Sequence, residues 1–175
     1  LAAPFVEQLP SGTVVVHVVR DPERALASLW RIGLFRTQSI YRAFAERHCA
    51  ALRDGTPMAR TARYWTHWNA LAERASERTD VRYLRVRAGE FDASTVQRIC
   101  GLLERDVEAA LVRHALASTP SDFNTAGERA KDASVDWSAL AGSAIARELS
   151  LSAQHYGFEA PDFRARLARS GPCVA

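Results

Sequence analysis

The stretch from residue 13 to residue 23 decides the fold, and it reads Thr13-Val14-Val15-Val16-His17-Val18-Val19-Arg20-Asp21-Pro22-Glu23. Its first half is a nearly continuous run of β-branched residues, which predicts a strand buried on both faces, as in parallel sheets. Its second half predicts a helix start. Asp21 can cap a helix, Pro22 suits the first turn, and Glu23 favours the positive end of the helix dipole. The stretch therefore predicts a strand that turns directly into a helix.

The rest of the chain alternates helical patterns with one more strand. Residues 81–86 alternate between apolar and polar side chains and predict the second strand, whereas helical spacing covers about residues 22–32, 38–53, 56–78, 93–104, 107–117 and 137–156. This order indicates an α/β fold that is rich in helices and has a parallel sheet. Two strands alone make a marginal sheet, and the chain begins with leucine. We therefore expect residues 1–160 to be a partial domain, incomplete at its N-terminus, and residues 161–175 to be a tail.

The composition excludes some classes of protein. The 175 residues include 23 Lys+Arg and 20 Asp+Glu, and Lys131 is the single lysine. Because the excess of positive charge is small and the basic residues are interspersed with Asp and Glu, the sequence does not favour a nucleic-acid binder. A Walker-type phosphate loop ends in Lys-Ser or Lys-Thr after a glycine-rich turn. Lys131 is followed by Asp132 and has no such turn before it.

The cysteines and the hydropathy bear on the cellular compartment. Cys49, Cys100 and Cys173 are odd in number and widely spaced, so they predict neither a disulfide framework nor a zinc site. The histidines have no ligand partners at metal spacing, and we expect no metal. No apolar run approaches the ~18 residues of a membrane span. These features favour a cytoplasmic protein.

Arg20 and Ser28 form the most informative pattern. A residue at the carboxyl end of a parallel strand lies at the edge where open α/β sheets bind ligands. The helix that starts at Pro22 directs its free N–H groups toward that edge, and Arg20 adds a guanidinium suited to phosphate. Ser28 lies two helical turns after Asp21 and shares its face. Together these residues predict an anion clamp.

This pattern, Val-Val-Val-His-Val-Val-Arg-Asp-Pro-(x)5-Ser, resembles the 3′-phosphate-binding motif of the sulfotransferases that use 3′-phosphoadenylyl sulfate (PAPS). The resemblance covers about residues 5–160 and implies a P-loop-like fold. It also implies transfer of a sulfuryl group from PAPS to a hydroxyl or amine of a small-molecule or carbohydrate acceptor. Arg20 and Ser28 would hold the 3′-phosphate of PAPS or of adenosine 3′,5′-bisphosphate. A polar loop at residues 118–137 resembles the family's basic loop and adds Arg129 and Lys131 as cofactor-binding candidates.

The sequence departs from the family at two places. Residues 87–91 resemble the family's Arg-Tyr-Glu-Asp-Leu segment, but Ala88 replaces the tyrosine. Pro10-Ser11-Gly12-Thr13 resembles the loop that holds the 5′-phosphosulfate, yet a strand follows it where a helix N-terminus is needed. That loop and the catalytic base are not found, so the catalytic residues stay unassigned and we expect little activity from these residues alone.

Three other functions remain open. The chain could be a non-catalytic module that binds a nucleotide or a partner chain, a kinase of the same architecture, or an arginine-rich nucleic-acid binder. The kinase should prefer ATP with Mg²⁺, and the nucleic-acid binder should lose affinity steeply with salt.

Several conspicuous residues have a structural interpretation. Tyr64, Trp65 and Trp68 share one face of a helix and predict core packing. His17 lies inside the first strand, where a catalytic base would be poorly placed. The helix arginines are expected to lie mostly on solvated surfaces; they are Arg42, Arg47, Arg53, Arg60 and Arg63.

Overall fold

The computed structural model describes residues 3–118 and 137–162. The chain divides into two compact units, which are described separately. The first unit consists of Leu1–Arg20 and Asn69–Ala126, and the second consists of Asp21–Trp68 and Gly127–Ala175.

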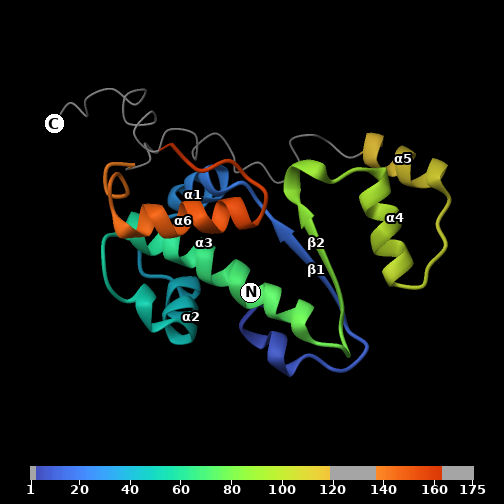
Figure 1. The fold of residues 1–175 in the computed structure, drawn as a ribbon, viewed down its shortest axis with the longest axis horizontal. Coiled ribbons are helices and arrows are strands. Elements are labelled where there is room, and N and C mark those ends of the chain that lie inside the picture. The colour runs from blue at the N-terminus through green and yellow to red at the C-terminus, as the bar shows by residue number, and fades with distance from the viewer. Residues whose placement is uncertain (1–2, 119–136, 163–175) are drawn as a thin grey trace. The chain divides into compact units, whose positions relative to one another are not determined.

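The sheet of the first unit consists of β1 (Val14–Val19) and β2 (Arg82–Arg87), which lie side by side and parallel (Figure 1). Their register runs from Val14 beside Arg82 to Val19 beside Arg87. The turn before β1 contains Gly12, whose φ of 81° favours glycine. Both predicted strands and the helix-rich α/β class with a parallel sheet are confirmed. The burial of β1 is less complete than predicted, since Val18 is 50% exposed.

The helical elements of the first unit are mostly short. They are the 3₁₀ helices η1 (Ala3–Gln8), η3 (Arg74–Glu77) and η4 (Ala88–Glu90), and the α-helices α4 (Ala93–Leu102) and α5 (Ala109–Ser118). Val6, Ala75 and Val81 form a buried cluster, and Val15 and Tyr83 pack against it. Arg78 fastens η1 to this cluster, because its guanidinium donates hydrogen bonds to the carbonyls of Val6 at 2.7 Å and Leu9 at 2.8 Å.

The second unit consists of helices. These are α1 (Pro22–Arg31), α2 (Ile40–His48), η2 (Ala50–Leu52), α3 (Pro57–Glu73, which passes into the first unit at Asn69) and α6 (Ala144–His155). Leu34, Phe35, Ala45 and Leu52 form its buried cluster. The predicted aromatic packing is confirmed: Tyr64 stacks on Trp68 at 4.4 Å, and Trp65 meets Tyr156 edge-on at 5.8 Å.

Two helix boundaries in the second unit differ from the prediction. The helix expected over residues 38–53 ends at His48, because Cys49 is extended with φ −144° and ψ 104°. The last helix begins at Ala144 and not near Trp137. Gly142 has a φ of 73°, which breaks the helical path, and the Ser143 hydroxyl accepts from the Ala146 N–H at 3.1 Å as the cap.

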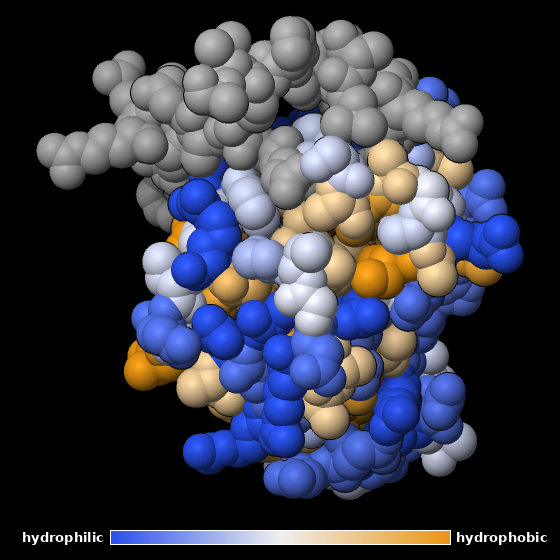
Figure 2. All heavy atoms as spheres, turned by 90° about the vertical axis from the view of Figure 1, so that its left-hand side faces the viewer, coloured by the Kyte–Doolittle hydropathy of each residue, from blue (hydrophilic) through white to orange (hydrophobic). Residues whose placement is uncertain are grey.

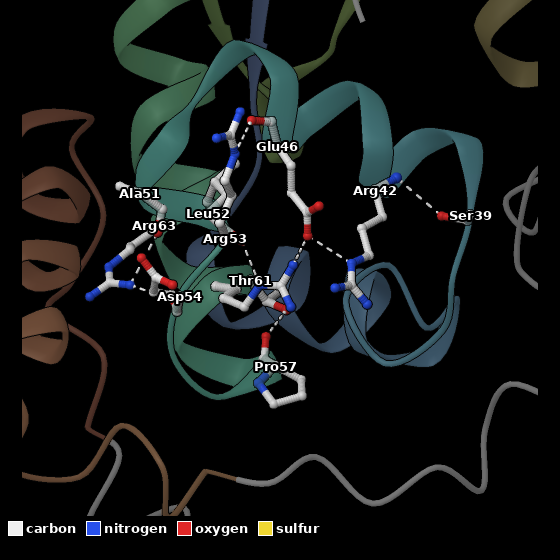
Figure 3. A network of polar contacts seen from close by, with 11 residues as sticks. Ser39, Arg42, Glu46, Ala51, Leu52, Arg53, Asp54, Pro57, Thr61 and Arg63 are labelled. Carbon is white, nitrogen blue, oxygen red and sulfur yellow. Dashed lines mark hydrogen bonds and ion pairs between the residues drawn. The ribbon is translucent and has the colours of Figure 1, made fainter.

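Arg60 is the exception to the prediction that these five helix arginines are mostly solvated. Its side chain is only 7% exposed, and its guanidinium donates hydrogen bonds to the Glu46 carboxylate and, at 2.5 Å, to the Leu52 carbonyl. Arg42 holds the same Glu46 carboxylate at 2.7 Å (Figure 3). Arg63 donates to the Ala51 carbonyl at 3.2 Å. Arg60 and Arg63 thereby satisfy carbonyl groups of the turn after α2 that no longer have helical partners.

The face of the molecule drawn in Figure 2 mixes hydrophilic and hydrophobic residues. Among the described residues of the second unit, the exposed large hydrophobic side chains are Ile32, Ile40, Tyr41 and Leu151. None of the helices among residues 3–118 and 137–162 combines the length and the apolar character needed to cross a membrane.

Candidate anion-binding site

The turn between β1 and α1 has the predicted local structure. Arg20 directly follows β1 and is exposed, and α1 begins two residues later at Pro22. The Asp21 carboxylate accepts a hydrogen bond from the Arg24 N–H at 2.9 Å, so Asp21 is the N-cap of α1. This cap places a negative charge at the helix N-terminus. The predicted N–H cradle is therefore partly occupied by the protein's own carboxylate, and anion binding must depend more on side chains.

Ser28 lies in the middle of α1 and is partly exposed. Within the described part of the chain, its hydroxyl has no hydrogen-bond partner, so it can donate to a ligand. Arg20 is the last residue of the first unit, and Ser28 belongs to the second. Their joint action on one phosphate therefore stays a prediction.

Arg87 is a further basic residue at the edge where Arg20 lies, and the sequence did not single it out. Because β1 and β2 are parallel and Val19 is in register with Arg87, their carboxyl ends meet at this edge. Arg87 forms an ion pair with Glu90 of η4. The strand register brings Arg87 to this edge. Because Arg87 lies 67 residues after Arg20, the sequence alone does not show that the two residues share the edge.

Arg129 and Lys131 lie outside the described residues, as does Cys173. Cys49 and Cys100 are free thiols. The described ranges hold no group of three or more His, Cys, Asp or Glu side chains placed to bind a metal ion.

His17, which lies within β1, is the centre of a polar network. Its ring is 6% exposed, with Nδ1 2.8 Å from the Tyr83 hydroxyl and Nε2 2.9 Å from the Asn69 side-chain oxygen. An amide oxygen only accepts, so Nε2 carries the hydrogen and Nδ1 accepts from Tyr83. In this neutral form of the imidazole, both ring nitrogens have a hydrogen-bond partner. The network joins α3 and β2 to the middle of β1.

Burial sets the titration of this network. Desolvation lowers the pKa of His17, and the hydrogen bond that its ring donates to Asn69 opposes that shift only in part. Burial, assisted by the Glu73 carboxylate, raises the pKa of Tyr83 to about 12. Glu73 in turn pairs with Arg85 at 2.7 Å. Both His17 and Tyr83 are therefore neutral at pH 7, in keeping with a structural role.

Comparisons of this chain with protein-family models, with curated proteins and with solved structures find no match.

Proposed function

We propose that this chain binds the 3′-phosphate of adenosine 3′,5′-bisphosphate and carries the 3′-phosphate-binding half of a sulfotransferase. The observation that carries the proposal is the exposed Arg20 at the carboxyl end of parallel strand β1, directly before the capped helix α1. Arg20 and Ser28 would hold the phosphate, and Arg129 and Lys131 are further candidates. Among the described residues, the hydroxyl of Ser28 and the position of Arg87 at the same edge as Arg20 fit an anionic group, whereas the Asp21 carboxylate opposes one.

PAPS would supply the sulfuryl group, and the acceptor would be a hydroxyl or amine of a small molecule or carbohydrate. The residues of this chain would bind and orient the nucleotide end of PAPS. No catalytic base is assigned. Free thiols and the resemblance favour a cytoplasmic setting.

Calorimetric titration with three nucleotides tests the proposal. We expect adenosine 3′,5′-bisphosphate to bind at least about tenfold more tightly than adenosine 5′-monophosphate, because only the former carries the phosphate that Arg20 and Ser28 recognise. Equal affinities for the two would overturn the proposal. Tighter binding of ATP with Mg²⁺ than of either would instead favour a kinase.

Asp21 gives a second test, in which affinity should increase. Asparagine caps helices as well as aspartate, so Asp21→Asn should leave the unfolding free energy within about 0.5 kcal/mol of the wild type. Removing the negative charge beside Arg20 should tighten bisphosphate binding by roughly threefold to fivefold. Glu148→Gln, which removes an exposed charge from α6, is the matched control and should leave the affinity unchanged. A weaker-binding Asp21→Asn variant would contradict an anion site at this turn.

A further inference from the structure

Arg87 lies close to Arg20 at the carboxyl end of the sheet, and both residues belong to the first unit. Val19 and Arg87 are partners in the parallel ladder, and Arg20 follows Val19 directly. Neighbouring strands lie about 4.8 Å apart and successive Cα atoms about 3.8 Å apart, so the Cα atoms of Arg20 and Arg87 lie within roughly 9 Å of each other. Two long arginine side chains at this separation can reach one phosphate, which has oxygens for both.

A carboxylate of the protein already occupies Arg87. The Arg87 guanidinium donates a hydrogen bond to the carboxylate of Glu90, the last residue of η4. Both side chains are open to solvent, with 38% of Arg87 and 54% of Glu90 exposed. An ion pair this exposed contributes little stability, whereas a guanidinium binds phosphate through strong, charge-assisted hydrogen bonds. A phosphate can therefore displace the Glu90 carboxylate at small cost.

The turn after β2 has the room and the backbone support that this displacement needs. Ala88, Gly89 and Glu90 are exposed, and a Cβ on Gly89 would meet no described atom within 4 Å apart from its chain neighbours. The Glu90 carbonyl accepts hydrogen bonds from the Thr95 hydroxyl at 2.9 Å and from the Asp92 N–H at 3.0 Å. These bonds fix the backbone of Glu90 against the start of α4. Only the side chain of Glu90 therefore has to rotate.

We propose that Arg87 is a second guanidinium of the phosphate site, and that the Glu90 carboxylate pairs with it until the 3′-phosphate of adenosine 3′,5′-bisphosphate displaces that carboxylate. This exchange rests on the proposed function, because it adds Arg87 to the site of Arg20. While Glu90 is paired, its charge cancels that of Arg87. Once Glu90 has turned away, Arg20 and Arg87 together balance the nearly two negative charges of a phosphate monoester.

Calorimetric titration of adenosine 3′,5′-bisphosphate into the wild type and three variants tests the exchange. We expect Arg87→Ala to weaken binding by about fivefold to thirtyfold, because one charge-assisted pair with phosphate is lost. Glu90→Gln should tighten binding by roughly threefold to fivefold, because it removes the competing carboxylate. In the double variant, Glu90→Gln should no longer tighten binding, since the carboxylate competes only for Arg87.

The ion pair of Arg82 and Glu104 provides the matched control, since it is exposed and lies at the other end of β2. Five residue steps separate Arg82 from Arg87, roughly 16 Å along the strand, which is about twice the Debye length at physiological salt. Glu104→Gln should therefore leave the affinity within about twofold of the wild type. Circular dichroism should show the same fold in all these variants.

The possible failures are distinguishable. The exchange alone is overturned if Arg20→Ala weakens bisphosphate binding while Arg87→Ala and Glu90→Gln bind as the wild type does. It is also overturned if Glu90→Gln tightens binding equally with and without Arg87, because Glu90 then acts only through its general charge. If adenosine 3′,5′-bisphosphate binds no more tightly than adenosine 5′-monophosphate, the proposed function fails and the exchange fails with it.

Discussion

Glu46→Ala is expected to lower the unfolding free energy by about 3 kcal/mol, because it leaves the buried guanidinium of Arg60 without its carboxylate. Arg60 is only 7% exposed, and the centre of its guanidinium lies 4.7 Å from the ring centre of Phe35. The Glu46 side chain that covers the guanidinium is 22% exposed, so water replaces the lost partner only in part. Denaturant unfolding followed by circular dichroism measures the change.

Two further variants distinguish the cost of leaving a buried charge unpaired from the cost of removing a side chain. Glu104→Ala removes the carboxylate of the exposed pair with Arg82, and it should cost less than about 1 kcal/mol. The double variant Glu46→Ala/Arg60→Met removes both charges and should be more stable than Glu46→Ala alone. If Glu46→Ala costs no more than Glu104→Ala, the Arg60 pair is not a buried ion pair in solution.

The second large effect is a loss of stability at acid pH that depends on His17. The folded state lowers the pKa of His17 below its ordinary value of 6.5, so at pH below about 6.5 the unfolded chain binds a proton that the folded chain does not. Stability should therefore fall as the pH decreases from 7, until the pH reaches the lowered pKa. The slope due to this one group is at most about 1.4 kcal/mol per pH unit.

The groups around His17 define the control. Tyr83 and Asn69 bond to the ring, while Glu73 and Arg85 act on it with opposite signs. His17→Gln removes the titrating group, so its unfolding free energy should depend less steeply on pH between 7 and 5 than that of the wild type. Parallel pH profiles for the two proteins would contradict a buried, neutral His17.

The sequence predicts those features of the fold that depend on neighbouring residues. The β-branched run of β1, the Asp21 cap of α1 and the alternating pattern of β2 each act over a few positions, and all three are confirmed. Burial of Arg60 could not be predicted, because its partner Glu46 lies on another helix and local spacing shows no link between them. The same holds for the partners of His17.

The candidate anion-binding site could likewise be predicted only in part from the sequence. Arg20 and its position after a parallel strand are evident from the sequence, whereas the arrival of Arg87 at that edge depends on the register of the two strands. The occupation of the α1 N-terminus by Asp21 could be anticipated as a cap. That the Asp21 carboxylate opposes a bound anion is clear only from the structure, in which it accepts a hydrogen bond from the Arg24 N–H.

Calorimetric titration of adenosine 3′,5′-bisphosphate into the wild type, Arg20→Ala and Arg24→Ala tests the nucleotide-binding proposal most directly. Arg24 is an exposed arginine in the first turn of α1, four residues from Arg20, and serves as the matched control. We expect Arg20→Ala to weaken binding by roughly tenfold to a hundredfold, because a charge-assisted pair with phosphate is lost, while Arg24→Ala changes the affinity by less than about threefold. Equal binding by the wild type and Arg20→Ala would contradict a phosphate site at the end of β1.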